Sequence, residues 1–392
     1  MFKSLSLLSL LALSASAIAE YEIRIPAGSL TEEQVAAAAA PAPIQDIVAF
    51  GRSAALIRES GDVWATGVVI NYLGYPAADK VFVNLSKDFG LTDVDAVSIS
   101  ETAIFFKKTD GTVLAAGSGS NGQLGLGATT TYNTPTLITG LTDVKKVVTG
   151  RYNTFFVKNN GELWYAGSNS NYISGDAGTP STNIPKKIFI TGVIDAAIGS
   201  KTSYAVVGSG SSGTVYSVGK NYSGSLGTGE STSQVRSQFY STGKSASFID
   251  ASTNGAIILS QLNGNASTVG QNSDGQLGHG DTGYRNRFSG VISSVVEVET
   301  YDYTNYVIKS DGTLWAAGRD NAGQATGNPS STADKLNFTQ SNITDVAHIA
   351  AGDAWAMALK NDGTLWVVGN NAYNYGLGQD GSAQSWTEVT FD

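Results

Sequence analysis

Short apolar runs separated by glycine turns recur along the chain. Residues 154–158 and 162–166 flank an Asn-Gly pair, and residues 356–360 and 364–368 flank an Asp-Gly pair. Because these pairs tolerate the positive φ of a tight turn, each stretch predicts a hairpin of two antiparallel strands. In the second strand the apolar residues are almost continuous, which is typical of a strand covered on both faces.

The hairpins form a regular repeat. A glycine that ends an apolar strand recurs every 48 to 52 residues, and a turn glycine precedes it by six positions. The strand-ending glycines are Gly67, Gly117, Gly167, Gly219, Gly270, Gly318 and Gly369. The structural turn glycines are Gly61, Gly111, Gly161, Gly213, Gly264, Gly312 and Gly363. About 50 residues accommodate four strands of five to six residues with their turns, which is one propeller blade.

Seven such units predict an all-β, seven-bladed β-propeller over residues 47–392. An open solenoid is the alternative, but it would need polar caps on both end repeats, and the last unit runs almost to the C-terminus. Closure is therefore favoured. We expect the final strand, residues 386–391, to join the blade that contains residues 47–50.

A column of mostly aromatic residues stands three positions before the strand-ending glycines. Its members are Trp64, Leu114, Trp164, Tyr216, Ser267, Trp315 and Trp366. A ladder for sugar ligands is one interpretation. Regular spacing inside a covered strand favours packing between blades instead.

Several motifs carry a resemblance to a known family. In the last repeat, residues 346–352 are followed by residues 355–359 and 362–366, and a Gly-Gln-Leu-Gly loop occurs at residues 122–125 and 275–278. This pattern resembles the regulator of chromosome condensation (RCC1-like) repeat, whose fold is a seven-bladed β-propeller. Kelch repeats would show Gly-Gly doublets, and repeats with a Trp-Asp signature have a shorter period.

The resemblance implies a protein-binding role, since a secreted member of the family inhibits β-lactamases through one face of its ring. The chromatin-associated founder is a nucleotide exchange factor that binds nucleosomes. The histidine that often follows the inner-strand glycine is absent here, where Trp355 and Asn153 stand. A predicted signal peptide, an acidic mature chain and the absence of a basic N-terminal arm argue against the founder's nuclear and DNA-binding roles.

The first 19 residues predict a secretory signal peptide. Lys3 precedes an apolar run from Leu5 to Leu13, and small residues precede Glu20. The run is too short for a retained membrane anchor. We expect residues 20–46 to form an N-terminal extension and linker, with a short helix ended by Pro41, and the mature protein to be secreted, extracellular or periplasmic.

Composition supports an exported β protein without nucleic-acid partners. Only 15% of residues are charged, 46 are glycine and none is cysteine, so disulfides and thiolate chemistry are excluded. The net charge is −9, and it becomes −10 without the predicted leader, which holds Lys3 and no acid. Such a chain repels phosphate backbones.

Few residues point to catalysis, so we predict no enzyme, no catalytic residue, no cofactor and no metal. His279 and His348 lie in different repeats and form no metal pair or catalytic triad in the sequence. The glycine-rich loops lack the helix and lysine of a phosphate-binding loop. Calcium could be considered at residues 272–275 or at Asp380, but neither shows the alternating acid spacing of a defined site.

The sequence favours a protein partner bound by loops at one face of the ring. Loops that follow the inner strands carry aromatic and charged side chains, which typify interface anchors. The candidate partner-binding residues are Arg151, Tyr152, Lys201, Tyr301, Tyr303, Asp353 and Trp355. Tyr306 and Trp355 could instead point into the blades.

Two other functions remain open. Residues 21–25 could add as a strand to a neighbouring molecule, which would make the chain a structural subunit with homo-assembly through residues 20–46. A glycan-binding or glycan-active propeller is the other alternative. Hydrolysis would then need paired carboxylates at the channel mouth.

Overall fold

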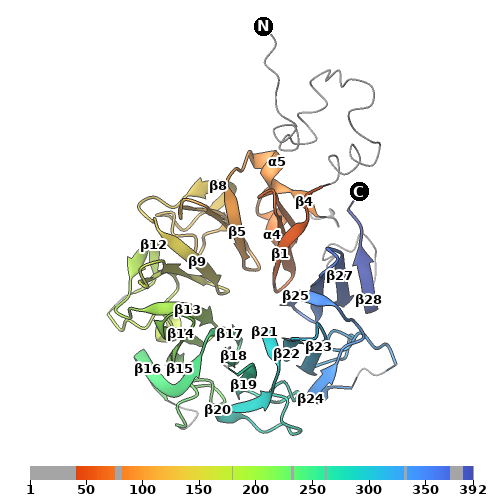
Figure 1. Ribbon diagram of the computed structural model, residues 1–392. Coiled ribbons are helices and arrows are strands. Elements are labelled where there is room, and N and C mark those ends of the chain that lie inside the picture. The colour runs from red at the N-terminus through yellow and green to blue at the C-terminus, as the bar shows by residue number, and fades with distance from the viewer. Residues whose placement is uncertain are drawn as a thin grey trace, which may run out of the picture. The chain divides into compact units, whose positions relative to one another are not determined.

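The predicted propeller is confirmed. The computed structural model describes residues 41–391 apart from 76–81, 179, 231–233, 261–262, 331–332 and 371–382. Seven four-stranded antiparallel sheets are arranged as blades around a central axis (Figure 1). The first strand begins at Ile44, three residues before the predicted start of the propeller. The predicted signal peptide, the N-terminal helix and Asp380 lie outside the described residues.

Each repeat forms one blade, and its strands lie in sequence order from the channel outward. The blades are, in order, β1 (Ile44–Phe50), β2 (Ser53–Arg58), β3 (Val63–Gly67) and β4 (Val83–Asn84); β5 (Val94–Ile99), β6 (Ala103–Lys108), β7 (Val113–Ser118) and β8 (Thr131–Leu137); β9 (Val144–Thr149), β10 (Asn153–Lys158), β11 (Leu163–Gly167) and β12 (Thr182–Lys187); β13 (Val193–Ile198), β14 (Thr202–Ser209), β15 (Ser212–Lys220) and β16 (Val235–Ala246); β17 (Phe248–Ser252), β18 (Gly255–Ser260), β19 (Asn265–Gly270) and β20 (Arg285–Ile292); β21 (Val295–Tyr301), β22 (Thr304–Lys309), β23 (Leu314–Gly318) and β24 (Lys335–Gln340); β25 (Val346–Gly352), β26 (Trp355–Lys360), β27 (Leu365–Gly369) and β28 (Ala383–Val389). The short helices are α4 (Val68–Asn71), α5 (Leu85–Phe89) and the 3₁₀ turn η1 (Ser170–Tyr172).

The core lies between the blades. Seven apolar clusters each combine residues of two neighbouring blades, including blades 7 and 1. Leu56 of blade 1 and Met357 of blade 7 are both 0% exposed in the cluster that joins the ends of the ring. Burying one such side chain stabilises the fold by about 1.5–3 kcal/mol, so the packing between blades holds the ring closed.

The expected pairing of the final strand is wrong. β28 pairs with β27 of its own blade, and blade 1 is completed by its own outer strand, β4. The C-terminal strand is therefore the outer strand of blade 7 and takes no part in the sheet of blade 1. Closure depends instead on side-chain packing and on the indole N–H of Trp355, which donates to the carbonyl oxygen of Gly51 at 2.8 Å.

The strand-ending glycines are required for two reasons: their φ is positive, and no room is left for a Cβ atom. Their φ values run from +86° to +113°. At Gly167 a Cβ would lie 2.4 Å from the carbonyl oxygen of Tyr152, and that oxygen already accepts the N–H of Ser168 at 2.9 Å. The carbonyl thus occupies the place of a side chain, which explains why every repeat ends this strand with glycine.

Six of the seven predicted turn glycines have positive φ and stand in the hairpin turns. The prediction for Gly213 is wrong, because this residue lies within β15 and pairs with Gly208. Strands β14 and β15 are longer than their counterparts, so the turn moves to Gly210, whose φ is +70°.

The aromatic column packs between blades as predicted. Trp164 lies half-buried against the cluster of blades 2 and 3, and Trp315 lies against that of blades 5 and 6. A lysine from the adjacent strand covers each ring, with Lys158 Nζ 4.9 Å and Lys309 Nζ 4.2 Å from the ring centroids. Such cation–π contacts contribute about 0.5–1 kcal/mol each.

The glycine-rich loops join each blade to the outer strand of the next. Gly127 N–H donates to the carbonyl oxygen of Asn183 at 2.8 Å, and the Asn183 side chain donates back to the carbonyl oxygen of Gly127 at 2.8 Å. Leu124 of the same loop is 0% exposed. These loops are structural turns that clamp neighbouring blades, as turn geometry predicts.

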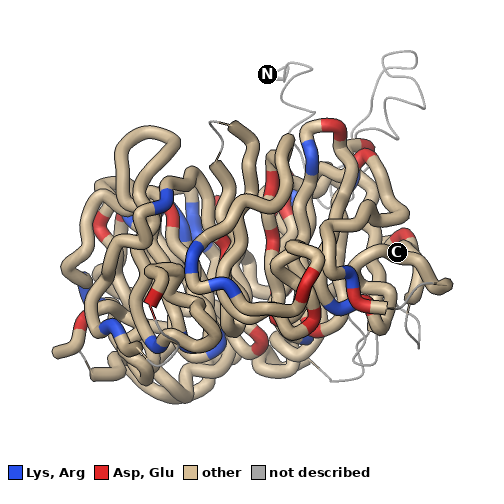
Figure 2. Tube along the Cα trace, turned by 90° about the horizontal axis from the view of Figure 1, so that it is seen from below, with Lys and Arg blue, Asp and Glu red and all other residues tan. Residues whose placement is uncertain are grey.

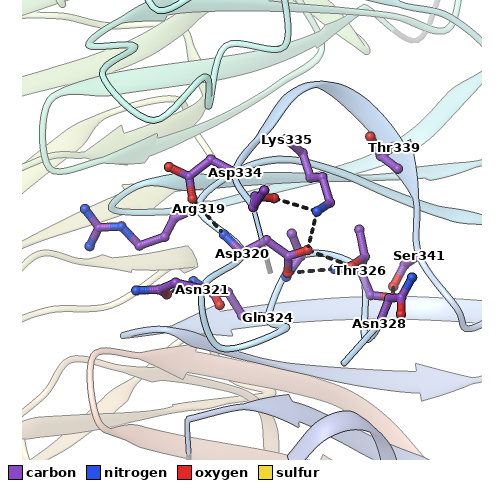
Figure 3. A network of polar contacts seen from close by, with 12 residues as sticks. Arg319, Asp320, Asn321, Gln324, Thr326, Asn328, Asp334, Lys335, Thr339 and Ser341 are labelled. Atoms are coloured by element: carbon purple, nitrogen blue, oxygen red, sulfur yellow. Dashed lines mark hydrogen bonds and ion pairs between the residues drawn. The ribbon is translucent and has the colours of Figure 1, made fainter. Parts of the chain in front are cut away.

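Repeat 6 places a carboxylate where repeats 4 and 5 have Asn221 and Asn272. Asp320 is 0% exposed, accepts the Ala325 N–H at 2.8 Å and forms an ion pair with Lys335 at 3.0 Å (Figure 3). A buried charge needs such a partner to offset its desolvation. Lys335 thus compensates for the change from asparagine to aspartate.

Candidate partner-binding face

The candidate site is one end of the propeller, which we call the loop face. It consists of the loops that join the first to the second strand and the third to the fourth strand of each blade. Antiparallel strands bring both sets to the same end, and the turn glycines lie at the opposite end, the turn face. Acidic and basic residues are interspersed over the propeller without separating to two sides (Figure 2).

Arg151 and Tyr152 stand on the loop face of blade 3 as predicted. Tyr152 is 48% exposed, and the Arg151 guanidinium lies 5.5 Å from the centroid of its ring. Arg151 also approaches Glu101 at 3.6 Å, while Arg52 donates to the same carboxylate at 2.7 Å. The Glu101 carboxylate of blade 2 therefore contacts arginines from the loops of blades 1 and 3.

Two more pairs of the same kind lie on this face. Lys201 Nζ lies 4.1 Å from the ring centroid of Tyr222, and the Arg319 guanidinium lies 3.9 Å from that of Tyr303. Arg319 is also held by Asp274 at 2.8 Å. Since each cation lies against its ring, the loop face presents three basic-aromatic pairs.

Tyr222 and Arg319, which belong to the loops after the third strand, were not predicted from the sequence as contact residues. The available signal was their position one to three residues beyond the strand-ending glycines Gly219 and Gly318. Tyr172, 43% exposed at the end of η1 in blade 3, was missed for the same reason.

Tyr301 lies across the channel mouth. Its ring packs edge-on against Phe50 at 5.4 Å, so a side chain of blade 6 reaches blade 1. Burial raises the pKa of the Tyr301 hydroxyl far above its usual range. The half-buried Tyr301 thus connects blades 6 and 1 past the inner strand of blade 7.

The structure removes Trp355 from the candidate contact residues. Its side chain is only 2% exposed within the interface of blades 7 and 1, and it presents no surface to a partner. Asp353 is exposed, and its backbone N–H donates to the Gly51 carbonyl oxygen at 2.8 Å. Asp302 accepts the Thr253 hydroxyl, and burial raises its pKa.

The inner strands surround a cavity of about 660 Å³. Each is an edge of its sheet, and acidic side chains of one blade accept the free N–H groups of the next. Asp195 accepts the Ile249 N–H at 3.0 Å, and Asp250 accepts the Thr300 N–H at 2.7 Å. These carboxylates therefore satisfy exposed strand edges and link neighbouring blades.

Two of the channel carboxylates are strongly perturbed. Burial raises the pKa of Asp250 to about 6. Burial also raises the pKa of Glu299 well above its usual range, and the negative charge of Asp250 raises it further. Glu299 also accepts the Ala351 N–H at 3.2 Å. Asp250 and Glu299 thus each accept an N–H group from the strand edge of the next blade.

The two histidines have different neighbours, a carboxylate for His348 and, for His279, the hydroxyl of Thr268, which is 0% exposed and donates to the Leu277 carbonyl oxygen at 2.9 Å. His348 Nδ1 lies 2.9 Å from Glu297 Oε2, a contact that raises the histidine pKa. Burial and then Arg285 lower the pKa of His279, whose Nε2 lies 3.3 Å from the Thr268 hydroxyl. Over the described residues no group of three or more His, Cys, Asp or Glu side chains could hold a metal ion.

In the part of the chain that the structure describes, no helix is long and apolar enough to cross a membrane. Residues 110–157 match the sequence model of the regulator of chromosome condensation (RCC1) repeat. That match extends from the hairpin turn of blade 2 into blade 3.

Solved structures of low identity share the fold. The crystal structure of Kap60 bound to yeast RCC1 (Prp20) matches with a TM-score of 0.72 at 16% identity, over 89% of this chain and 84% of that chain. Prp20p from Saccharomyces cerevisiae matches at 0.70 and 16%, over 90% and 87%. Human WBSCR16 matches at 0.68 and 18%, over 80% and 84%. One repeat, residues 110–157, thus matches the RCC1 repeat model, and the seven-bladed fold is similar to that of RCC1-type β-propellers.

Proposed function

We propose that this chain is an exported RCC1-like propeller that binds a protein partner through its loop face. The observation that carries the proposal is the set of three basic-aromatic pairs, Arg151 with Tyr152, Lys201 with Tyr222 and Arg319 with Tyr303. Tyrosine and arginine are enriched among residues that dominate binding energy at protein interfaces. Similar structures include a complex of yeast RCC1 with Kap60 and a study of Prp20p binding to Gsp1p and histones, which supports a protein partner.

The geometry of the pairs supports low-cost binding. Each ring is already covered on one side by a cation from its own or a neighbouring loop, so less side-chain freedom is lost when a partner docks. Arg319 is further fixed by Asp274. The face is thus ordered before binding.

Affinity capture with a triple variant tests the proposal. Tyr152, Tyr222 and Tyr303 are changed to alanine in the full chain, and proteins retained from the native extracellular fraction are compared with those retained by the wild type. The matched control is Tyr240→Ala, because Tyr240 is 51% exposed in β16 and carries Arg236 at 4.5 Å from its ring. We expect the triple variant to lose the partner and Y240A to retain it; equal loss in both would refute the proposal.

Export is a separate part of the proposal, supported by the pattern of residues 1–19. The mature protein should begin at Glu20, and N-terminal sequencing of protein from the extracellular or periplasmic fraction tests this. Protein that keeps Met1 and stays in the cytoplasm would refute export without affecting the loop-face proposal.

A further inference from the structure

One repeat departs from the others at three neighbouring positions on the outer rim. In blade 5 the aromatic column holds Ser267, and the position that carries a capping cation elsewhere holds Ser260. The cross-strand partner of Ser267 in the outer strand is Gly290. All three side chains are small where the other repeats hold larger ones.

The other blades show what normally fills this place. In blade 7, Trp366 pairs with Glu388 of the outer strand, and Lys360 lies 5.8 Å from its ring. In blade 3, Trp164 is paired with Lys187 and covered by Lys158. Blades 3 and 7 therefore fill this site with three features: an indole ring, a cation on the face of that ring and a long side chain across from it on the outer strand. Blade 5 has none of them.

The departure leaves a cleft between blades 4 and 5, which we call the rim cleft. Its lining includes Lys244, Ile258, Ser260, Ser267, Gly290 and Ile292, and its volume is about 630 Å³. The corresponding place between blades 6 and 7, where Trp366 and Trp386 remain, measures about 360 Å³. The rim cleft is larger where the ring is missing.

Backbone geometry does not explain the glycine. Gly290 lies in β20 without a positive φ, and a Cβ built there would meet only the Ser267 hydroxyl oxygen, at 3.9 Å. This contrasts with Gly270, the strand-ending glycine of the same blade, whose φ is +105° and whose Cβ would lie 2.3 Å from a carbonyl oxygen. The small size of Gly290 keeps the cleft open and serves no turn.

The cleft retains the surroundings of an aromatic ring without the ring. Ile258, directly opposite Ser267 on β18, belongs to the core between blades 4 and 5 and contributes an apolar part of the cleft lining. Lys244 of blade 4 lines the cleft and supplies a cation. A wall and a cation are the two partners that Trp164 and Trp315 have in their own blades.

We infer that the rim cleft binds an aromatic side chain, tryptophan above all, presented by a partner segment. The ring would stand against Ile258 where other repeats hold their own indole, with Lys244 over its face. This site is distinct from the loop face, since it lies on the rim near the hairpin turn of blade 5. The inference does not depend on the proposed function.

Ligand-observed saturation-transfer NMR with the full chain tests the inference. The probes are N-acetyl-L-tryptophanamide, N-acetyl-L-leucinamide and methyl α-D-glucopyranoside. We expect the indole probe alone to receive saturation, with a Kd of about 1 mM because a single ring buries little area. Stronger transfer to the glucoside or to the leucine probe would overturn the inference.

Variants locate the binding. Ser267→Trp supplies the ring that the other blades carry, so it should abolish binding and raise the thermal midpoint. Gly290→Gln introduces the type of side chain found at Gln340 in blade 6 and should also abolish binding, even if Ser267→Trp fails to fold. Retained binding in both folded variants would overturn the inference.

The charge and the site are tested separately. Lys244→Gln should weaken binding about threefold, as the loss of a cation–π contact predicts, and Lys186→Gln on the exposed face of β12 should leave it unchanged. Tyr152→Ala should also leave it unchanged, since Tyr152 belongs to the loop face. A loss with Tyr152→Ala and no loss with Lys244→Gln would place the probe at the loop face and overturn the inference.

Discussion

Replacing Gly167 by alanine should destabilise the propeller far more than replacing Gly140. Both residues have positive φ, +111° and +80°, so alanine is strained at either position by about 1–2 kcal/mol. The difference lies in space. A Cβ at Gly140 meets no atom within 4 Å, whereas at Gly167 it would lie 2.4 Å from the Tyr152 carbonyl oxygen and 2.6 Å from the Asn153 Cα.

The displacement of the Tyr152 carbonyl determines how much free energy of unfolding Gly167→Ala should lose. Moving the Tyr152 carbonyl breaks its hydrogen bond from Ser168, which costs about 1 kcal/mol, and the forced backbone shift costs about 1–3 kcal/mol more. We therefore expect a loss of about 4 kcal/mol for Gly167→Ala and about 1 kcal/mol for Gly140→Ala. Urea unfolding followed by tryptophan fluorescence gives both values. Losses that agree within about 1 kcal/mol would show that the close approach of the carbonyl is not what requires glycine.

Three further changes follow from the structure. The pKa of Asp250 is about 6 in the folded protein and about 3.9 in an unfolded chain, so only the folded state holds the proton between about pH 4 and 6. The free energy of unfolding therefore falls as pH rises through that window. Asp250→Asn should make the urea midpoint less dependent on pH over the same range. Lys335→Met should cost about 3 kcal/mol by leaving the Asp320 carboxylate buried without a cation, and adding Asp320→Asn should restore most of it in the same denaturation assay. Trp355→Phe should cost about 1–2 kcal/mol in thermal or urea unfolding by removing the indole N–H bond to Gly51, whereas an unchanged midpoint would exclude that bond from ring closure.

The repeat could be predicted from the sequence because its conserved offsets reflect local backbone needs. Turn glycines and strand-ending glycines are dictated by φ and by nearby carbonyls, and both recur in every copy. Gly213 was misplaced because the lengths of β14 and β15 depend on their pairing, which spacing does not reveal. The final strand was misplaced because β4, the outer strand of blade 1, has only two residues, and an apolar stretch does not reveal so short a pairing.

The candidate site was less accessible to sequence reasoning. Trp355 begins β26 at the position that Asn153 holds in β10, one residue beyond the counterpart of Tyr152, and the two aromatic side chains are 2% and 48% exposed. The Trp355 side chain lies in the interface that closes the ring, where its indole N–H donates to the carbonyl oxygen of Gly51 in blade 1. Since that neighbour is about 300 residues away in sequence, no local pattern could indicate which aromatic residue would be buried.

A residue that departs from the repeat indicates function when no other residue of the protein compensates for the departure. The change to Asp320 in repeat 6 is answered within the protein by Lys335, which neutralises the buried carboxylate. The changes at Ser267 and Gly290 in repeat 5 have no such answer, since small side chains meet across the strands and leave about 630 Å³. A fold maintained by packing between blades loses stability wherever an indole is removed. The loss at the rim cleft is therefore most simply explained by a ring supplied from outside.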